Sequence, residues 1–417
     1  MRAPIFAFLG ISGTAVALCA AGIALFLIGV LAGKNKIAEA HGLDKIVALT
    51  NVCFAIPLAV FGALHLFGTQ FVIGLVPRYM PWRSFWVYFV GCALIAASLS
   101  IATKTAVRWS GLLFGIMMFL FVAMIHLRGA LARPHDRIIW TIVFREMSFG
   151  GAGWILAGTA IDGWRGRGRT ALIVVGRLLI AIALILFGIE HFLHPTGLPG
   201  VPLQKQMPTW IPGRELIDYV TGVALIVAGG SILLARKTRT AAAYLGAWIL
   251  LLVLVIYGPV LIVALSEPGI AVQIEGINYF TDTLLFAGTI LTVASATPWS
   301  RPAELTQRQR RRRTGGDGAR ALLDQSRSLL PDGLSFRMVM PPLPVLVLLL
   351  VLQALVVAVF QLPLTQPRPI SLTLVIVPDV IVLVRAVVDA VFGAIGAVAI
   401  LGRRGRRRTE RDGESTD

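Results

Sequence analysis

Long runs of apolar residues alternate with short polar connectors along most of the chain. Most runs are close to the ~20 residues that a helix needs to cross a bilayer, and none alternates like a barrel strand. The pattern predicts an all-α polytopic membrane protein with about eleven transmembrane helices. The runs are Ile5–Leu31, Ile46–Phe67, Phe85–Thr103, Val107–Leu127, Glu146–Ile161, Leu172–His194, Glu215–Ala235, Ala241–Leu265, Asn278–Ala296, Val345–Phe360 and Ile370–Leu401.

Composition supports this interpretation. Of the 417 residues, 57% are hydrophobic and only 14% are charged, and the mean hydropathy of +0.81 excludes a soluble globular class. The first run continues to Leu31, beyond the length of a signal-peptide core, so we expect a membrane anchor. Cys19, Cys53 and Cys92 all lie in apolar runs without a CxxC motif, which indicates neither a disulfide nor a thiol redox centre.

Basic residues give an orientation. When connectors are assigned alternately to the two sides, well over half of the 38 lysines and arginines fall on one side. Because Lys and Arg collect in the cytoplasm, the N-terminus is expected outside and the C-terminus inside a plasma (inner) membrane. The connector 128–145 is the one basic segment on the opposite side.

Two segments of the chain resemble one another. FGALHLF (Phe61–Phe67) matches FGIEHFL (Phe187–Leu193), and VPRYMPW (Val76–Trp82) matches MPTWIPG (Met207–Gly213) after a five-residue gap. After that gap the offset stays constant as far as His126 and Tyr257, which predicts a duplicated unit of four helices. An even number of helices gives both copies the same orientation in the membrane.

The FG-x-x-HF helix end, the proline-rich connector and the Y-x-x-G that follows resemble the DoxX family of small four-helix membrane proteins. The resemblance covers residues 46–296 and implies two tandem four-helix bundles. For some members of that family it also implies a partnership in quinone-linked sulfur or thiol redox chemistry.

The expected organisation follows from these segments. Residues 1–45 form an anchor and loop, 46–161 the first repeat, 172–296 the second, 297–340 a basic disordered cytoplasmic linker, 341–402 C-terminal helices and 403–417 a charged tail. The linker contains QRQRRRR and is expected to lie against anionic lipids rather than nucleic acid. Whether 370–401 is one helix or two stays open, and one helix keeps the tail inside.

Candidate chemistry lies at the outward ends of the helices. Ionisable groups inside apolar helices are costly and are usually functional, although headgroup contact and an aromatic belt explain many such residues. The ligand-binding candidates are Glu190, His191, His194, Tyr219, Tyr257 and Asp282 in the second repeat, with His65 and His126 in the first. We expect the second repeat to gather its six residues into a polar cup under the connector 195–213. In the first repeat we expect Arg145 and Glu146 to form an internal ion pair.

Three functions are consistent with the sequence. The first is the membrane subunit of a quinone-linked redox assembly, with a redox protein as partner. The alternatives are a small-molecule transporter and a non-enzymatic scaffold. The pattern indicates no metal site and no cofactor held by the chain itself, with quinone as the ligand of the redox hypothesis, and catalytic residues are not identified.

Overall fold

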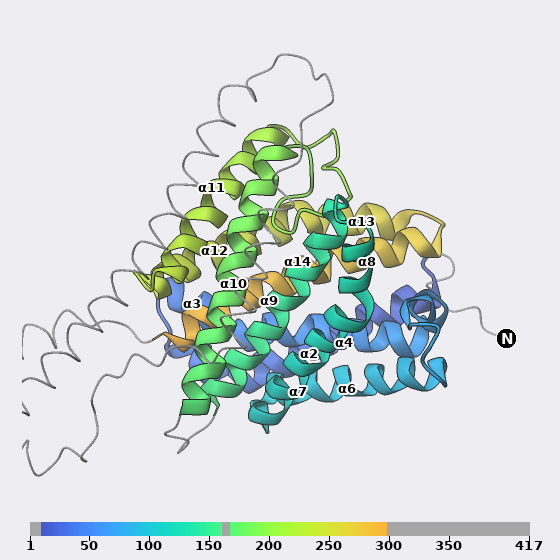
Figure 1. Cartoon of the computed structure of the whole chain (residues 1–417), viewed down its shortest axis with the longest axis horizontal. Coiled ribbons are helices and arrows are strands. Elements are labelled where there is room, and N and C mark those ends of the chain that lie inside the picture. The colour runs from blue at the N-terminus through green and yellow to red at the C-terminus, as the bar shows by residue number, and fades with distance from the viewer. Residues whose placement is uncertain (1–9, 161–166, 298–417) are drawn as a thin grey trace, which may run out of the picture. The chain divides into compact units, whose positions relative to one another are not determined.

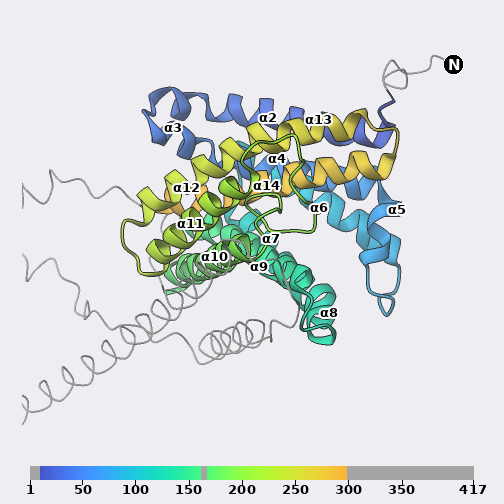
Figure 2. The ribbon, with the colours of Figure 1, turned by 90° about the horizontal axis from the view of Figure 1, so that it is seen from above.

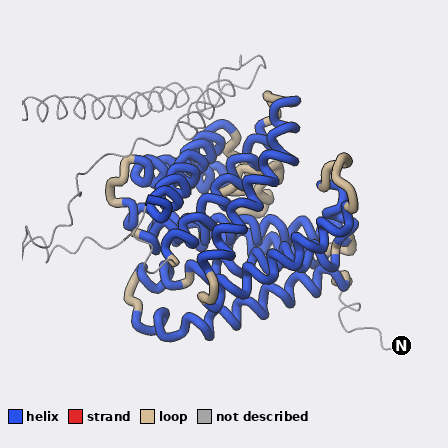
Figure 3. Tube along the Cα trace, turned by 60° about the horizontal axis from the view of Figure 1, so that its bottom comes forward, coloured by secondary structure: helices blue, strands red, loops and turns tan. Residues whose placement is uncertain are grey.

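Helices make up most of the described part of the computed structural model, which covers residues 10–160 and 167–297 (Figure 1). Within these ranges no β strand occurs, and the loops are short except for the connector after residue 193 (Figure 3). The predicted linker, the last two apolar runs and the tail lie outside the described residues. The helices are α2 (Gly13–Glu39), α3 (Leu43–Ala48), α4 (Thr50–Phe67), α5 (Thr69–Val72), η1 (Ile73–Leu75), α6 (Arg83–Thr103), α7 (Val107–Phe121), η2 (Val122–His126), α8 (Leu127–Ala132), α9 (Arg137–Thr159), α10 (Arg167–Leu193), α11 (Arg214–Leu233), α12 (Thr238–Leu252), η3 (Val253–Tyr257), α13 (Gly258–Ser266) and α14 (Ile270–Ala296).

Eight helical segments in the described part are long and apolar enough to cross a membrane. They include the first one, Gly13–Glu39, and the last one, Ile270–Ala296. Large apolar side chains such as Phe26, Leu113 and Leu254 are exposed on their surfaces, as expected for helices that contact lipid. The described part is therefore an all-α protein of the integral membrane class.

Helix α9 differs from its prediction. The apolar run begins at Glu146, but the helix begins at Arg137, after Asp136 caps it by accepting hydrogen bonds from the backbone N–H groups of Ile138 and Ile139. The segment predicted as the basic connector 128–145 is thus largely helical, with Arg137 and Arg145 inside α9. Both arginines form ion pairs inside the fold, Arg137 with Glu190 and Arg145 with Asp282. Helix α14 likewise starts at Ile270 and not at Asn278.

The sequence predicted two four-helix bundles in which helices pack mainly within their own bundle. In the structure, helices of one half pack against helices of the other half. We call residues 46–161 the first half and residues 172–296 the second half. Helix α14 of the second half packs along α4 of the first, and α9 of the first packs along α10 of the second (Figures 1 and 2). Helices α9 and α14 also contact each other. Helix α14 is the most buried of the eight candidate spans, with 83% of its apolar window inside.

Glycines permit this close contact between the halves. A Cβ atom on Gly151 of α9 would lie 2.9 Å from the carbonyl oxygen of Gly176 in α10. A Cβ atom on Gly288 of α14 would lie 2.9 Å from the backbone nitrogen of Phe54 in α4. Small residues let membrane helices approach closely, so backbone contacts hold these two seams together.

Local geometry recurs at the positions that the sequence pairs between the halves. The π-helical turns η2 and η3 occupy matching places in Val107–Ala132 and Thr238–Ser266. Trp82 and Gly213, which precede α6 and α11, both have positive φ angles, of 50° and 65°. In both halves the arginine that follows bonds the connector backbone: Arg83 bonds the Val76 oxygen and Arg214 the Met207 oxygen, each at 3.1 Å.

Candidate functional site

The central polar cluster lies where α9 meets α14. We define it as His126, Arg145, Glu146 and Asp282. Arg145 lies 2.7 Å from an Asp282 carboxylate oxygen and 3.5 Å from Glu146 Oε1. His126, at the end of η2, places Nε2 3.0 Å from the same Glu146 oxygen. The expected Arg145–Glu146 ion pair is thus present, but the shorter bond of Arg145 crosses to the second half.

Several polar atoms of this region are buried without a hydrogen-bond partner among the described residues. They are Arg145 Nε, Glu146 Oε2 and the side-chain oxygen of Asn278. Glu146 is only 8% exposed. Buried polar groups are nearly always satisfied by protein, water or ligand. The cluster therefore offers both a donor and acceptors to a small polar molecule.

Asp282 lies near the middle of α14, roughly 20 Å from either end at 1.5 Å per residue. The sequence suggested a position close to the outer surface because the helix was expected to begin at Asn278. A charged residue at this depth is costly unless it is paired, and Arg145 supplies the pairing charge.

Glu190 lies between Arg137 and His194 in a second polar group. Glu190 Oε2 lies 3.4 Å from Arg137 and 3.1 Å from His194 Nδ1. Arg137 also donates to the Pro202 carbonyl oxygen at 3.3 Å, which ties α9 to the long connector. Arg137 was not predicted as a site residue because the sequence pattern placed this arginine in a loop, whereas it lies in helix α9.

The ring of His191 has a structural role. Its Nε2 accepts a hydrogen bond from the Gly200 N–H at 2.8 Å, so Nδ1 carries the proton and donates to the Phe187 oxygen at 2.6 Å. The imidazole is 1% exposed. Because both nitrogens are occupied, His191 holds the connector and has no free position for a ligand. Asp218 faces the ring at 3.8 Å, and its Oδ1 has no hydrogen-bond partner in the described chain.

The remaining sequence candidates are engaged by other partners. Tyr257 is buried and donates to the Pro199 oxygen at 2.8 Å. Tyr219 stacks on Phe192 with ring centroids 5.7 Å apart. His65 bonds the Phe61 oxygen at 2.7 Å, the counterpart of the His191–Phe187 contact.

The connector 194–213 fills the space that the sequence assigned to the cup. Leu198, Val201 and Met207 are each at most 2% exposed. Their burial, together with the Gly200 and Pro199 bonds, makes the connector a plug in the second half. A short antiparallel bridge between Gly197 and Gln206 closes it.

Metal binding has no support in the described residues, which contain no group of three or more His, Cys, Asp or Glu side chains placed to hold an ion. Comparison with known proteins matched no family model, no curated protein and no solved structure. The class of the protein therefore rests on its apolar helices, and the resemblance to the DoxX family stays a prediction.

Proposed function

We propose that the protein is a membrane subunit that handles protons in a quinone-linked redox reaction, with the central polar cluster as its reactive region. The observation that carries this proposal is the His126–Glu146 pair at 3.0 Å, beside a Glu146 oxygen that is buried and unpaired. An imidazole hydrogen-bonded to a carboxylate is a common arrangement for general acid–base catalysis. The proposal includes two copies of a four-helix unit, in which only the first copy carries this pair.

The chemistry divides between this chain and a partner. Reduction of a quinone to a quinol consumes two electrons and two protons. A partner redox protein supplies both electrons, and the His126–Glu146 pair passes two protons in succession from water to the two quinone oxygens. Arg145 keeps Glu146 close to its working position and, being always charged, contributes a donor to the carbonyl acceptors of the headgroup.

The corresponding positions of the second half provide a control. Tyr257 stands at the position of His126, at the end of the matching π-helical turn, and its hydroxyl bonds the plug. A change at Tyr257 therefore tests general damage to the fold, whereas a change at His126 tests the acid–base pair.

The test is the affinity of a short-chain quinone for the purified protein in lipid nanodiscs, read by quenching of tryptophan fluorescence. Glu146→Gln and His126→Gln keep the side-chain volumes and are expected to weaken binding about tenfold, the effect of losing one hydrogen bond to a charged group. Tyr257→Phe is expected to bind like the wild type. Equal affinity in all four proteins, or binding in none, rejects the redox proposal.

A second function, proton-coupled transport, is favoured by a separate observation. Both halves carry a π-helical turn at matching positions, and the charged cluster lies between the halves and not within one. Transporters often place ion sites at the interface between repeats, and π-helical turns are frequent at functional sites. Proton flux into liposomes containing the protein, abolished by Asp282→Asn and without quinone binding, would favour this function.

A further inference from the structure

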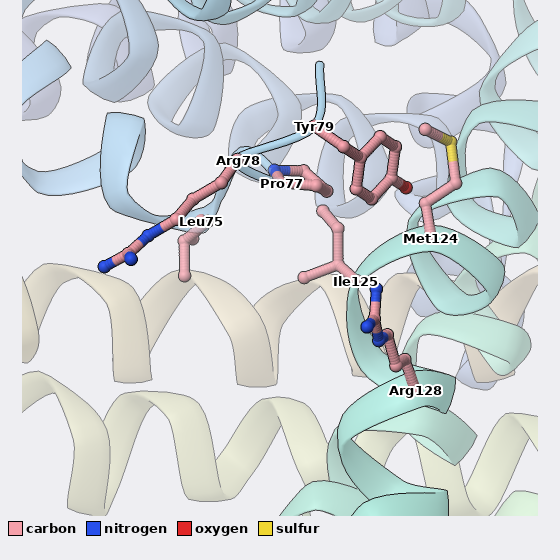
Figure 4. Close-up of a pocket in the computed structure, with 7 residues that line it drawn as sticks. All are labelled: Leu75, Pro77, Arg78, Tyr79, Met124, Ile125 and Arg128. Atoms are coloured by element: carbon pink, nitrogen blue, oxygen red, sulfur yellow. The ribbon is translucent and has the colours of Figure 1, made fainter.

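A pocket of about 410 Å³ opens between the first-half connector and the η2–α8 turn (Figure 4). This volume is in the range of small-ligand sites. Leu75, Pro77, Met124 and Ile125 give it an apolar floor. The remaining lining residues are Arg78, Tyr79 and Arg128.

The lining is cationic and contains no acid. Figure 4 shows Arg78 and Arg128 on opposite sides of the apolar floor, with the Tyr79 ring facing Met124. Both arginines are exposed, and within the described chain neither makes an ion pair or a side-chain hydrogen bond. Their guanidinium groups are therefore available to an anion, which Arg can bind through two parallel hydrogen bonds.

The connector that forms one wall is held in place by the neighbouring arginine. Arg83 donates to the carbonyl oxygens of Val76 and Ile73, which fixes the chain on either side of Leu75. The opposite wall is helical. The backbone of both walls is thus in place before a ligand arrives, so the ordering cost of binding is limited to side chains.

The depth of the pocket suits a lipid headgroup. Arg128 lies one turn before the end of α8 at Ala132, roughly 6 Å from the helix end at 1.5 Å per residue. Tyr79 and Trp82, 61% and 79% exposed, lie in the same connector. Aromatic side chains of this kind concentrate where the hydrocarbon meets the headgroups.

We propose that this pocket binds the phosphate headgroup of an anionic membrane phospholipid. Arg128, whose guanidinium lies beside Ile125, binds the phosphate, Arg78 adds positive charge at the edge of the pocket, and the Tyr79 hydroxyl bonds the polar part of the headgroup. An acyl chain then runs over Leu75 and Ile125 into the bilayer. The inference is independent of the proton chemistry at the central polar cluster.

The second half lacks these cations at the paired positions. Thr209 and Trp210 replace Arg78 and Tyr79, and Pro259 replaces Arg128. We therefore expect one specific lipid site of this kind in the described pair of halves, and not two.

Native mass spectrometry of the delipidated protein tests the proposal. Phosphatidylglycerol and phosphatidylcholine are titrated separately, and the wild type is expected to bind the anionic lipid at least tenfold more tightly. The double variant Arg78→Gln/Arg128→Gln is expected to lose this preference. Arg133→Gln removes the same charge from a nearby side chain that is 68% exposed, and is expected to keep it.

A second variant separates the pocket from general surface charge. Ile125→Trp fills the apolar floor and leaves both arginines, so it is expected to lower phosphatidylglycerol affinity about tenfold. A preference that survives either the double variant or Ile125→Trp overturns the proposal. Competition by inorganic phosphate without any preference between the two lipids overturns it as well, because the site would then belong to a soluble anion.

Discussion

The ion pair between Arg145 and Asp282 allows a quantitative test of the contact between the halves. The two side chains are 2.7 Å apart and only 15% and 14% exposed. Removing one partner of a buried pair typically costs about 3–5 kcal/mol, because the other charge stays desolvated. Glu146, 3.5 Å from Arg145, retains part of the compensation. We therefore expect Asp282→Ala to lower the free energy of unfolding by about 3 kcal/mol, the low end of that range.

The double variant Arg145→Met/Asp282→Leu gives the complementary prediction. It removes both charges and fills their volume with apolar atoms, so its stability is expected within about 1 kcal/mol of the wild type or above it. Glu146 keeps His126 as its partner in this variant.

Reversible unfolding in mixed detergent–lipid micelles, followed by tryptophan fluorescence, measures both effects. Glu275→Gln is the matched control, since its pair with Lys205 is 3.1 Å long but Glu275 is 48% exposed. Exposed pairs contribute about 0–1 kcal/mol. These expectations would be refuted if Asp282→Ala lowered the free energy of unfolding by less than about 1 kcal/mol and the double variant were no more stable than Asp282→Ala. Arg145 and Asp282 would then not form a buried ion pair between the halves.

Two further predictions use the same unfolding assay. His191→Ala leaves the Gly200 N–H buried without its acceptor and is expected to lower the free energy of unfolding by at least about 1–3 kcal/mol. His65→Ala removes only a contact within its own helix and is expected to lower it less. Equal losses in the two variants would contradict the structural role of His191. Gly151→Ala is expected to destabilise the protein because the added Cβ atom would lie 2.9 Å from the Gly176 carbonyl oxygen. Gly230→Ala adds a Cβ atom with no neighbouring atom within 4 Å and is expected to stabilise the protein by about 0.5–1 kcal/mol. Stabilisation by both alanines would contradict the close contact between α9 and α10.

The sequence predicted helices well in segments whose residues are apolar along their whole length, as contact with lipid requires. Apolar runs such as Ile46–Phe67 and Leu172–His194 became helices because a bilayer leaves the backbone few other ways to satisfy its hydrogen bonds. The predictions failed at the starts of α9 and α14, where polar residues resemble a loop. Gln273 shows the reason, since its fully buried amide bonds the backbone at Ser12 and Gly10. Polarity that is satisfied inside the fold cannot be told from solvated polarity in a single sequence.

The candidate site was predicted in part. Arg145, Glu146, His126 and Asp282 were all identified as chemically notable residues, but they were divided between two separate bundles. The space predicted as a cup is occupied by the connector itself. Pro199 and Gly200 use their backbone atoms to occupy Tyr257 and His191, and a sequence motif gives no sign of such backbone partners.

One feature of the sequence accompanies the packing between the two halves. Arg145 and Asp282 each stand six residues before a glycine, Gly151 or Gly288, that packs against the first helix of the opposite half. In two copies related by an axis along the membrane normal, residues beside that axis face their own counterparts. Identical charges at such positions would repel, whereas Arg145 and Asp282 attract each other. The difference in residue number between matching positions is larger for α9 and α14 than for the preceding helices. For this reason the constant offset did not pair Arg145 with Asp282. The contact between α9 and α14 thus joins opposite charges at these two positions.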